Sequence, residues 1–274
     1  MKTFRRILYG LLFLVFATVF VVSAVVIGRY VINSKKQDDK YSSLSQQVEQ
    51  IKNNNNSTNP TDPSTTVPEI TAPYTDPETL EPGTIFPEYA VIYEMNNDMV
   101  GWIKIPDTRI DYPVLQTPNY KDYYLTRTFF KEYDGHGAIY IREQCDVNKP
   151  SDNITIYGHH MYDGTMFADL DKFKEKSFWE DHQYFTFDTL TEHHTYQVMC
   201  VFKTSGTTGV GFPYHKFVDA ENAEEFDEFV SYVKALAFYE TGVTAEFGDK
   251  LICLSTCEYT LNNGRFVLVA KRVS

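Results

Sequence analysis

Residues 251–273, LICLSTCEYTLNNGRFVLVAKRV, decide the fold of this 274-residue chain. Two runs within it, 251–256 and 265–273, are rich in apolar and β-branched residues that favour β-strands. The polar segment between them ends in Asn-Asn-Gly, a typical turn signal, so the stretch predicts a β-hairpin. The last residue of one hairpin strand lies near the first residue of the next. We therefore expect Cys257 and Arg265 to be neighbours at one rim of a sheet.

A second motif, NITIYGHHM at residues 153–161, predicts another strand that ends at this rim. Residues 153–157 favour a β-strand, and Gly158 then turns the chain so that His159 projects from the strand end. If this strand lies near the hairpin in the sheet, a thiol, an imidazole and a guanidinium share one edge of that sheet. A nucleophile, a proton carrier and a fixed positive charge are the groups that acyl transfer through a thioester requires.

Other roles for the cysteines stay open at this point. A free cysteine is most often a small buried apolar residue. This interpretation suits three of the four: Cys145, Cys200 and Cys253. A zinc site is the sharper alternative, with four ligands: Cys253, Cys257, His159 and His160. Four residues along a strand span roughly 13 Å, however, which is too far for two sulfurs to bind one ion, so we expect no metal.

The remaining histidines also offer alternatives. His160 competes with its neighbour His159 for a catalytic role, because both follow Gly158 directly. His193 and His194 lie in the polar run TEHHT between two expected strands, which predicts a solvated turn. From the residues alone, the choice between His159 and His160 is not decided.

At these residues the chain resembles the sortases, the cysteine transpeptidases of Gram-positive surfaces. The resemblance rests first on LSTC before the turn, on IYGHHM after a strand, and on an arginine that opens the following strand. The resemblance extends over residues 88–274, and within the family the chain is most similar to class B. Four segments recur in that class in this order: GWIKIPDTRIDYPVLQ (101–116), YYLTRTFF (123–130), GHGAIYI (135–141) and YGHHMYDGTMFADL (157–170).

The resemblance implies a role for each matching residue. Cys257 matches the nucleophile, His159 the general acid and base, and Arg265 the residue that stabilises the oxyanion or the substrate carbonyl. Four residues match positions that line the peptide groove: Leu125, Tyr157, Ser255 and Glu258. One position departs from the family pattern, because Lys121 stands where class B enzymes often have an asparagine four residues before the leucine. Recognition of the first residues of the peptide is therefore left open.

The resemblance also implies the fold class. It is mainly β with flanking helices: an eight-stranded closed β-barrel with an N-terminal helix and a long helix between strands six and seven. The sequence predicts a helix over residues 88–97 and the long helix over 220–238, with Asp219 as its cap. The apolar face of the long helix holds four residues: Phe226, Phe229, Val230 and Val233. Beyond the hairpin, strands are expected at 101–105, 111–115, 137–141, 153–157, 184–187 and 196–203.

The N-terminal part predicts a membrane anchor. Residues 7–28 carry no charge, and at about 1.5 Å per residue they match a hydrocarbon core of roughly 30 Å. A cleaved signal peptide with Val22-Ser23-Ala24 at the cleavage site is the alternative, but the apolar run exceeds the usual length of about 7–15 residues.

Four parts follow from this interpretation. They are a cytoplasmic N-terminus (1–6), a transmembrane signal-anchor (7–28), a low-complexity extracellular spacer (29–85) and a catalytic domain (86–274). Within the spacer, residues 41–51 have apolar residues at helical spacing and predict one or two helical turns. The chain then crosses the membrane once, with its N-terminus inside, because the resemblance requires an active site outside the cell.

Composition narrows the function further. A net charge of −12 and a pI near 5.0 argue against a nucleic-acid partner, which needs a basic face. No cofactor is expected. The resemblance implies an enzyme that cleaves a C-terminal sorting motif, of the form Asn-Pro-x-Thr-x or a variant, through a thioester on Cys257. Its acceptor is an amine of a peptidoglycan precursor or of a pilin lysine. A hydrolytic cysteine peptidase and a non-catalytic binding module on a stalk remain as alternatives.

Overall fold

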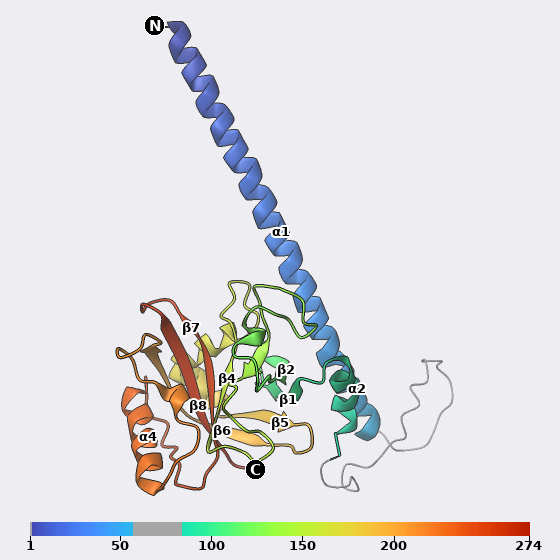
Figure 1. Ribbon diagram of the computed structural model, residues 1–274, viewed down its shortest axis with the longest axis vertical. Helices are drawn as coiled ribbons and strands as arrows, with labels where there is room; N and C mark the ends of the chain where they lie inside the picture. The colour runs from blue at the N-terminus through green and yellow to red at the C-terminus, as the bar shows by residue number, and fades with distance from the viewer. Residues whose placement is uncertain (1, 57–83) are drawn as a thin grey trace, which may run out of the picture. The chain divides into compact units, whose positions relative to one another are not determined.

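Eight strands close into a barrel in the order β1-β2-β3-β4-β7-β8-β6-β5, with β5 pairing back onto β1. This is a computed structural model, and it describes residues 2–56 and 84–274 (Figure 1). The β2–β3 and β4–β7 pairs are parallel and the others antiparallel. The strands are β1 (Met99–Lys104), β2 (Asp111–Leu115), β3 (Ile139–Ile141), β4 (Asn153–Tyr157), β5 (Tyr184–Thr189), β6 (Thr195–Ser205), β7 (Leu251–Glu258) and β8 (Gly264–Arg272). The predicted closed barrel is confirmed.

Helices flank the barrel rather than interrupt it. They are α1 (Lys2–Asn56), α2 (Pro87–Met95), α3 (Lys176–Asp181) and α4 (Ala223–Leu236), with short 3₁₀ helices η2 (Tyr123–Leu125), η3 (Ala168–Lys174) and η4 (Tyr214–Lys216). The predicted N-terminal helix corresponds to α2, and the predicted long helix between strands six and seven corresponds to α4.

The two faces of β7 have different neighbours. Leu254 lies in register with Ile156 of β4 and Leu268 of β8, and all three are completely buried in the barrel. Because alternate side chains of a strand point to opposite faces, Cys253, Ser255 and Cys257 share the outer face. Cys253 packs there in an apolar cluster with α4, as does Val267 of β8. The outer face is therefore covered by α4 at one end, while the end that carries Cys257 lies beyond this cover.

The apolar face of α4 agrees with the sequence, but its cap does not. Phe226, Phe229, Val230 and Val233 are all buried, as predicted. The helix begins at Ala223, where the side-chain oxygen of Asn222 accepts the N–H of Glu225. The predicted cap, Asp219, instead accepts the backbone N–H of Asp152. Asp219 was the wrong cap because its carboxylate holds the loop before β4.

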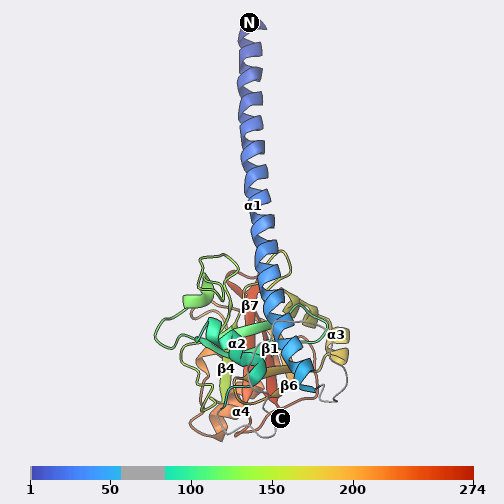
Figure 2. The same cartoon turned by 90° about the vertical axis from the view of Figure 1, so that its right-hand side faces the viewer.

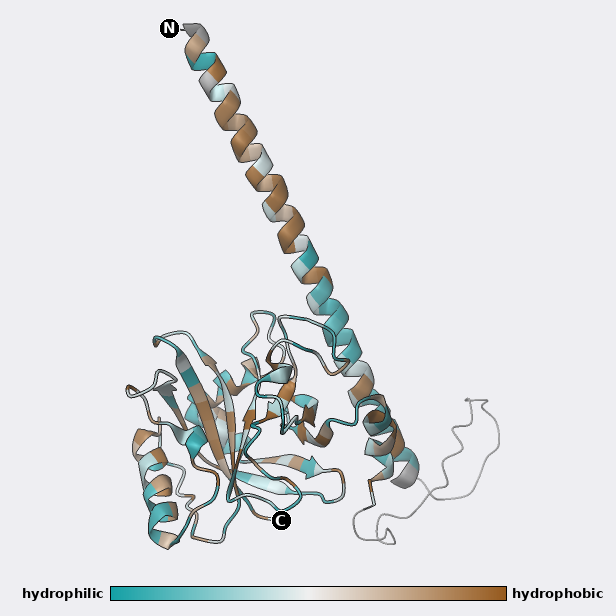
Figure 3. Ribbon diagram, viewed as in Figure 1, coloured by the Kyte–Doolittle hydropathy of each residue, from teal (hydrophilic) through white to brown (hydrophobic). Residues whose placement is uncertain are grey.

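The first part of α1 is apolar over nearly all its turns. In Figure 3 the N-terminal turns are brown and the following turns are teal. The segment Phe4–Asn54 contains a stretch that is long and apolar enough to cross a membrane, and none of that stretch is buried. A signal sequence would meet the same criteria. Residues Met1–Ser43 form a compact unit of their own.

The last turns of α1 belong with the barrel. The second compact unit is Leu44–Ser274, and in it Leu44 and Val48 are both buried. Glu49 contacts Lys104 of β1 at 2.6 Å, and Lys52 donates to the hydroxyl of Tyr89 of α2 at 3.2 Å. Figures 1 and 2 both show α2 beside these turns.

The predicted spacer over 29–85 therefore differs from the structure. Residues 29–56 are helical, because they contain neither glycine nor proline and place apolar residues at helical spacing. The compact unit that contains the barrel also begins at residue 44 rather than at 86. The proline-rich remainder of the predicted spacer lies in residues 57–83, outside the described residues.

We expect Leu44→Ala to lower the stability of a soluble fragment that begins at Arg29. Leu44 is 2 % exposed, and removing a leucine side chain from such a site costs about 2–4 kcal/mol. For a domain of this size, the melting temperature should fall by roughly 4–16 °C. Gln46→Ala, at an exposed position two residues further on, is the matched control. Equal melting temperatures for the two variants would show that α1 contributes no packing.

Candidate active site

The C-terminal hairpin brings a thiol and a guanidinium together. β7 and β8 pair with Cys257 opposite Arg265 and with Glu258 opposite Gly264. Directly opposed residues of an antiparallel pair have Cβ atoms about 4.5–5.5 Å apart. Gly264 permits this close pairing, since a Cβ there would collide with the carbonyl oxygen of Glu258. Cys257 and Arg265 therefore stand side by side at one rim, as expected from the turn.

The imidazole comes from the end of β4. This strand is parallel to β7, with Tyr157 opposite Ser255. The N–H of Gly158 donates to the carbonyl of Ser255 at 3.1 Å, and His159 follows. The His159 side chain reaches Cys257, and the two are hydrogen-bonded. Three strand ends thus place the thiol, the imidazole and the guanidinium at the same rim.

A backbone carbonyl orients the His159 ring. Nε2 of His159 lies 2.7 Å from the carbonyl oxygen of Leu125, at the end of η2. A carbonyl can only accept, so the neutral ring carries its proton on Nε2. Nδ1 is then the nitrogen with a free lone pair for the Cys257 thiol. In this tautomer His159 is ready to take the thiol proton.

Electrostatics favour the charged forms of both partners. The hydrogen bond from His159 lowers the pKa of Cys257 below its ordinary value, with a further contribution from the Arg265 charge, although burial opposes both. The same hydrogen bond raises the pKa of His159, aided by the Leu125 carbonyl and opposed by burial and by Arg265. The pair therefore has more thiolate and imidazolium than isolated side chains would have at neutral pH.

Arg265 keeps its charge available to a ligand. Its Nη1 donates to the carbonyl oxygens of Gly264 at 2.9 Å and Asn263 at 3.3 Å, which fixes the plane of the guanidinium. Among the described residues, no carboxylate forms an ion pair with it. Arginine stays charged at any physiological pH. A positioned cation beside a nucleophile suits the stabilisation of an oxyanion.

The three groups lie in a groove of about 840 Å³. Leu125, Tyr157 and Ser255, which the sequence predicts as groove residues, all line it. Ser255 is buried beneath Tyr214, whose hydroxyl lies 2.6 Å from the serine oxygen. The β6–β7 connection supplies a long part of the wall, from residue 205 to residue 216.

Glu258 does not line this groove. Its carboxylate accepts the backbone N–H groups of Thr260 at 3.0 Å and Leu261 at 3.1 Å within the β7–β8 turn. These bonds lower the pKa of Glu258, with burial acting in the opposite direction. Glu258 therefore shapes the turn that sets Arg265 opposite Cys257, and the prediction that it faces the peptide is corrected.

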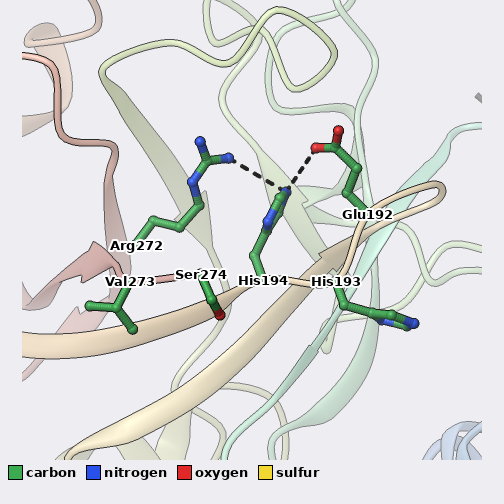
Figure 4. A pocket seen from close by; sticks show the side chains of 6 residues that line it. All are labelled: Glu192, His193, His194, Arg272, Val273 and Ser274. Atoms are coloured by element: carbon green, nitrogen blue, oxygen red, sulfur yellow. Dashed lines mark hydrogen bonds and ion pairs between the residues drawn. The ribbon is translucent and has the colours of Figure 1, made fainter. Parts of the chain in front are cut away.

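The other candidate histidines lie elsewhere. His160 does not line the groove; its ring packs edge-on against the ring of Tyr259, and its carbonyl accepts the Tyr259 hydroxyl at 2.9 Å. His193 and His194 border a shallow hollow between the β5–β6 turn and the C-terminal end of β8 (Figure 4). Arg272, which also lines this hollow, is seven positions along β8 from Arg265. The hollow is thus at the opposite end of that strand from the catalytic rim.

Figure 4 shows His194 between Arg272 and Glu192, at 3.5 Å and 3.2 Å from its Nε2. Burial and the Arg272 charge lower the pKa of His194, although Glu192 opposes them. His194 is only 9 % exposed, so the prediction of a solvated turn is wrong for this residue. His193 is about half exposed and bonds to Asp188 at 2.9 Å.

The remaining cysteines are buried and free. Cys145, Cys200 and Cys253 all lie in the interior, whereas Cys257 is half-buried. In the described ranges 2–56 and 84–274, no group of three or more histidine, cysteine or acidic side chains is placed to hold a metal ion.

We expect iodoacetamide at pH 7 to modify Cys257 at least about 100-fold faster than the other cysteines, since the thiolate is the reacting form. Burial raises the pKa of Cys145 to about 11 and that of Cys200 to about 12, and it raises the pKa of Cys253 well above its ordinary value. Peptide mass spectrometry across a pH series measures each rate. His159→Gln should move the Cys257 profile to higher pH, because the hydrogen bond from His159 is what lowers its pKa most. Equal labelling of Cys145 and Cys257 in the folded protein would contradict this assignment.

Two parts of the site are missing from the sequence prediction. The carbonyl of Leu125 that orients His159 is a backbone group, and patterns of side chains in the sequence do not predict its position. Tyr214, which covers Ser255, lies in a segment of 205–216 without regular periodicity. An aromatic residue in a glycine-containing loop was the only available signal there.

Comparison with known proteins agrees with this geometry. The family model described as the Sortase domain matches residues 103–273. The chain is similar to Sortase B of Listeria monocytogenes, with 34% identity over 195 residues, covering 70% of this chain and 76% of that protein. It is also similar to Sortase B of Staphylococcus aureus, with 32% identity over 187 residues, covering 68% and 74%.

Solved structures give the same result. The Staphylococcus aureus sortase B–substrate complex superimposes with a TM-score of 0.72 at 26% identity, covering 89% of this chain and 99% of that one. Sortase B from Bacillus anthracis in complex with AAEK1 gives a TM-score of 0.63 at 31% identity, covering 71% and 88%. The likeness therefore includes the barrel and the helices around it.

Proposed function

This chain belongs to the sortase family as a class B member, and from that membership we propose how it acts on surface proteins. It is a cysteine transpeptidase. In our proposal it cleaves a C-terminal sorting motif of secreted proteins, of the form Asn-Pro-x-Thr-x or a variant, after the threonine. It then joins the new carboxyl end to an amine of a peptidoglycan precursor.

In the first half-reaction, the Cys257 thiolate attacks the carbonyl carbon of the motif threonine. The developing oxyanion lies toward the Arg265 guanidinium, whose other N–H groups remain free of the hairpin carbonyls. The C–N bond breaks as His159 transfers its proton to the leaving amine. The products are a threonyl thioester on Cys257 and a neutral His159.

In the second half-reaction, the acceptor amine attacks the thioester carbonyl. Neutral His159 takes the proton that the amine loses, and Cys257 leaves as a thiolate. The enzyme returns to its starting protonation state with one peptide bond broken and one formed. A single acid and base is sufficient, because the two half-reactions need opposite proton transfers at the same place.

One observation carries the proposal. The ends of β4, β7 and β8 place His159, Cys257 and Arg265 together at one end of a groove, and the His159 hydrogen bond lowers the pKa of the thiol. A binding module on a stalk would have no need for a thiol with a lowered pKa. A hydrolytic peptidase would use the same three groups with water as the acceptor.

We also propose that α1 holds the enzyme in the membrane by a single span, with the N-terminus inside and the barrel outside the cell. The apolar first part of α1 supports this placement. Protease added to intact cells should digest the barrel domain while a tag at the N-terminus stays protected. Protection of the barrel would reverse the proposed orientation.

The test of the reaction is mass spectrometry of a fragment that begins at Arg29, incubated with sorting-motif peptides and triglycine. We expect a peptide–triglycine product and an acyl adduct on Cys257. Hydrolysis alone at high triglycine, with the adduct present, would favour the peptidase. In that case a pilin-type lysine peptide replaces triglycine, because a pilin-polymerising enzyme would accept lysine.

A further inference from the structure

The groove extends well beyond the catalytic rim, and its far end is marked by Arg142. The N–H of Arg142, directly after β3, donates to the carbonyl of Thr155 at 2.9 Å. Arg142 is thus opposite Thr155 of β4, four positions before His159. At about 3.3 Å per strand residue, the far end lies roughly 13 Å from the catalytic rim. Both ends belong to the same groove.

Arg142 has no acceptor for part of its guanidinium. Its Nη1 is buried and finds no hydrogen-bond partner among the residues that the structure describes, and no carboxylate of those residues forms an ion pair with it. A buried N–H without an acceptor is unfavourable, so this guanidinium calls for an acceptor from outside the chain. The groove beside it is the place from which that partner can come.

Other unpaired cations surround this end of the groove. Lys121 and Lys216 line it, and in the described part of the chain neither takes part in an ion pair. Burial lowers the pKa of His215 between them, and the charges of Arg142, Lys216 and Lys121 lower it further, so this ring stays neutral. Three fixed positive charges thus converge on one place in a chain whose net charge is −12.

The acidic residues of the same wall have other partners. Asp122 accepts the hydroxyl of Tyr140 at 3.1 Å, and Glu143 accepts the side-chain amide of Gln144 at 2.9 Å. Both contribute negative charge near the far end, but neither reaches Arg142 as an ion pair. The balance at this end therefore remains positive.

We propose that Arg142, together with Lys121 and Lys216, forms a subsite for an acidic side chain of the sorting peptide. The inference rests on the proposed function and names the substrate more closely. The residues before the motif threonine stay attached to Cys257 through both half-reactions, so they occupy the groove while the amines exchange. An extended peptide covers roughly 13 Å in four residues. The acidic residue then lies four positions before the threonine, directly before the Asn of the motif.

The test compares peptides that carry the same motif and differ only at the position directly before its Asn, with Glu, Gln or Lys there in turn. With the wild-type fragment, kcat/KM should be about 10- to 100-fold higher for the Glu peptide than for the Gln peptide, as for a hydrogen bond to a charged group. Arg142→Gln should remove this preference, and Arg142→Lys should keep part of it. Arg109→Gln, which removes an exposed guanidinium outside the groove, should leave the preference intact.

Binding of the same peptides to the Cys257→Ala variant, followed by fluorescence anisotropy, tests the subsite without catalysis. The Glu peptide should bind more tightly than the Gln peptide, and the difference should shrink at high salt. Equal kcat/KM and equal binding for the two peptides, with an acyl adduct on Cys257, would overturn the subsite and leave the transpeptidase in place. Absence of any Cys257 adduct, with preferential binding of the Glu peptide, would overturn the proposed reaction and support the subsite.

Discussion

Cys257→Ala should abolish both the acyl adduct and the transpeptidation product. No other thiol can replace it, because Cys145, Cys200 and Cys253 are buried with raised pKa values. We expect kcat/KM to fall by at least about 10⁴-fold, as when the nucleophile of a catalytic unit is removed. Product formation is measured by mass spectrometry with sorting-motif peptide and triglycine.

Stability and chemistry can be separated in this experiment. Cys257 is half-buried at the end of a strand, so its truncation should cost about 1 kcal/mol and leave a cooperative melting transition. Cys253→Ala is the matched control, since it removes a thiol from the same face of β7 but beneath α4. This control should lose more stability than Cys257→Ala and retain the acyl adduct. Activity that survives in Cys257→Ala would remove the thioester from the mechanism.

The local pairing of the hairpin could be predicted because turn chemistry and strand register are short-range properties. Asn-Asn-Gly after a β-favouring run is sufficient to place Cys257 opposite Arg265. The position of His159 depends on a parallel pairing between β4 and β7, which lie about a hundred residues apart in sequence. Periodicity alone does not specify such a pairing, so that prediction depended on the resemblance to a family.

What the sequence did not predict involves backbone groups and side chains with more than one role. The Leu125 carbonyl orients His159, and Glu258 bonds to two N–H groups of its own turn rather than lining the groove. The same residue types would be present without these contacts, so the sequence pattern does not reveal them. The length of α1 was underestimated for a different reason: the apolar spacing over residues 41–51 predicts one or two helical turns, but the polar residues before and after them resemble a spacer, whereas the helix runs to Asn56 with Leu44 and Val48 buried.

The alternation of side chains along β7 determines which part of its outer face lines the groove. Side chains on the outer face of β7 alternate with core residues, so α4 can cover Cys253 while the same face continues to Ser255 and Cys257. The barrel interior therefore supports the catalytic rim without any catalytic group being buried in it. A rigid strand end holds each functional side chain, which is the arrangement that positions a nucleophile and its base precisely.

Arg265→Lys should lower kcat by about 10²- to 10³-fold, with a smaller change in KM. Lysine keeps the positive charge but loses the planar fork that two hairpin carbonyls hold in place. An interaction that strengthens as the oxyanion forms affects the transition state more than the bound peptide, and removal of one oxyanion donor typically has an effect of this size. Steady-state transpeptidation at saturating triglycine separates the two constants.

Arg272→Lys is the control for this change, because it makes the same substitution near the other end of β8, beside His194. Its activity should stay within about twofold of wild type, since surface substitutions away from special features have small effects. If Arg265→Lys were equally active, the fixed geometry of the fork would be irrelevant and a point charge would be sufficient. A large loss confined to Arg265 would instead mean that the hairpin turn, through Gly264 and the Glu258 carboxylate, positions the oxyanion donor as well as the nucleophile beside it.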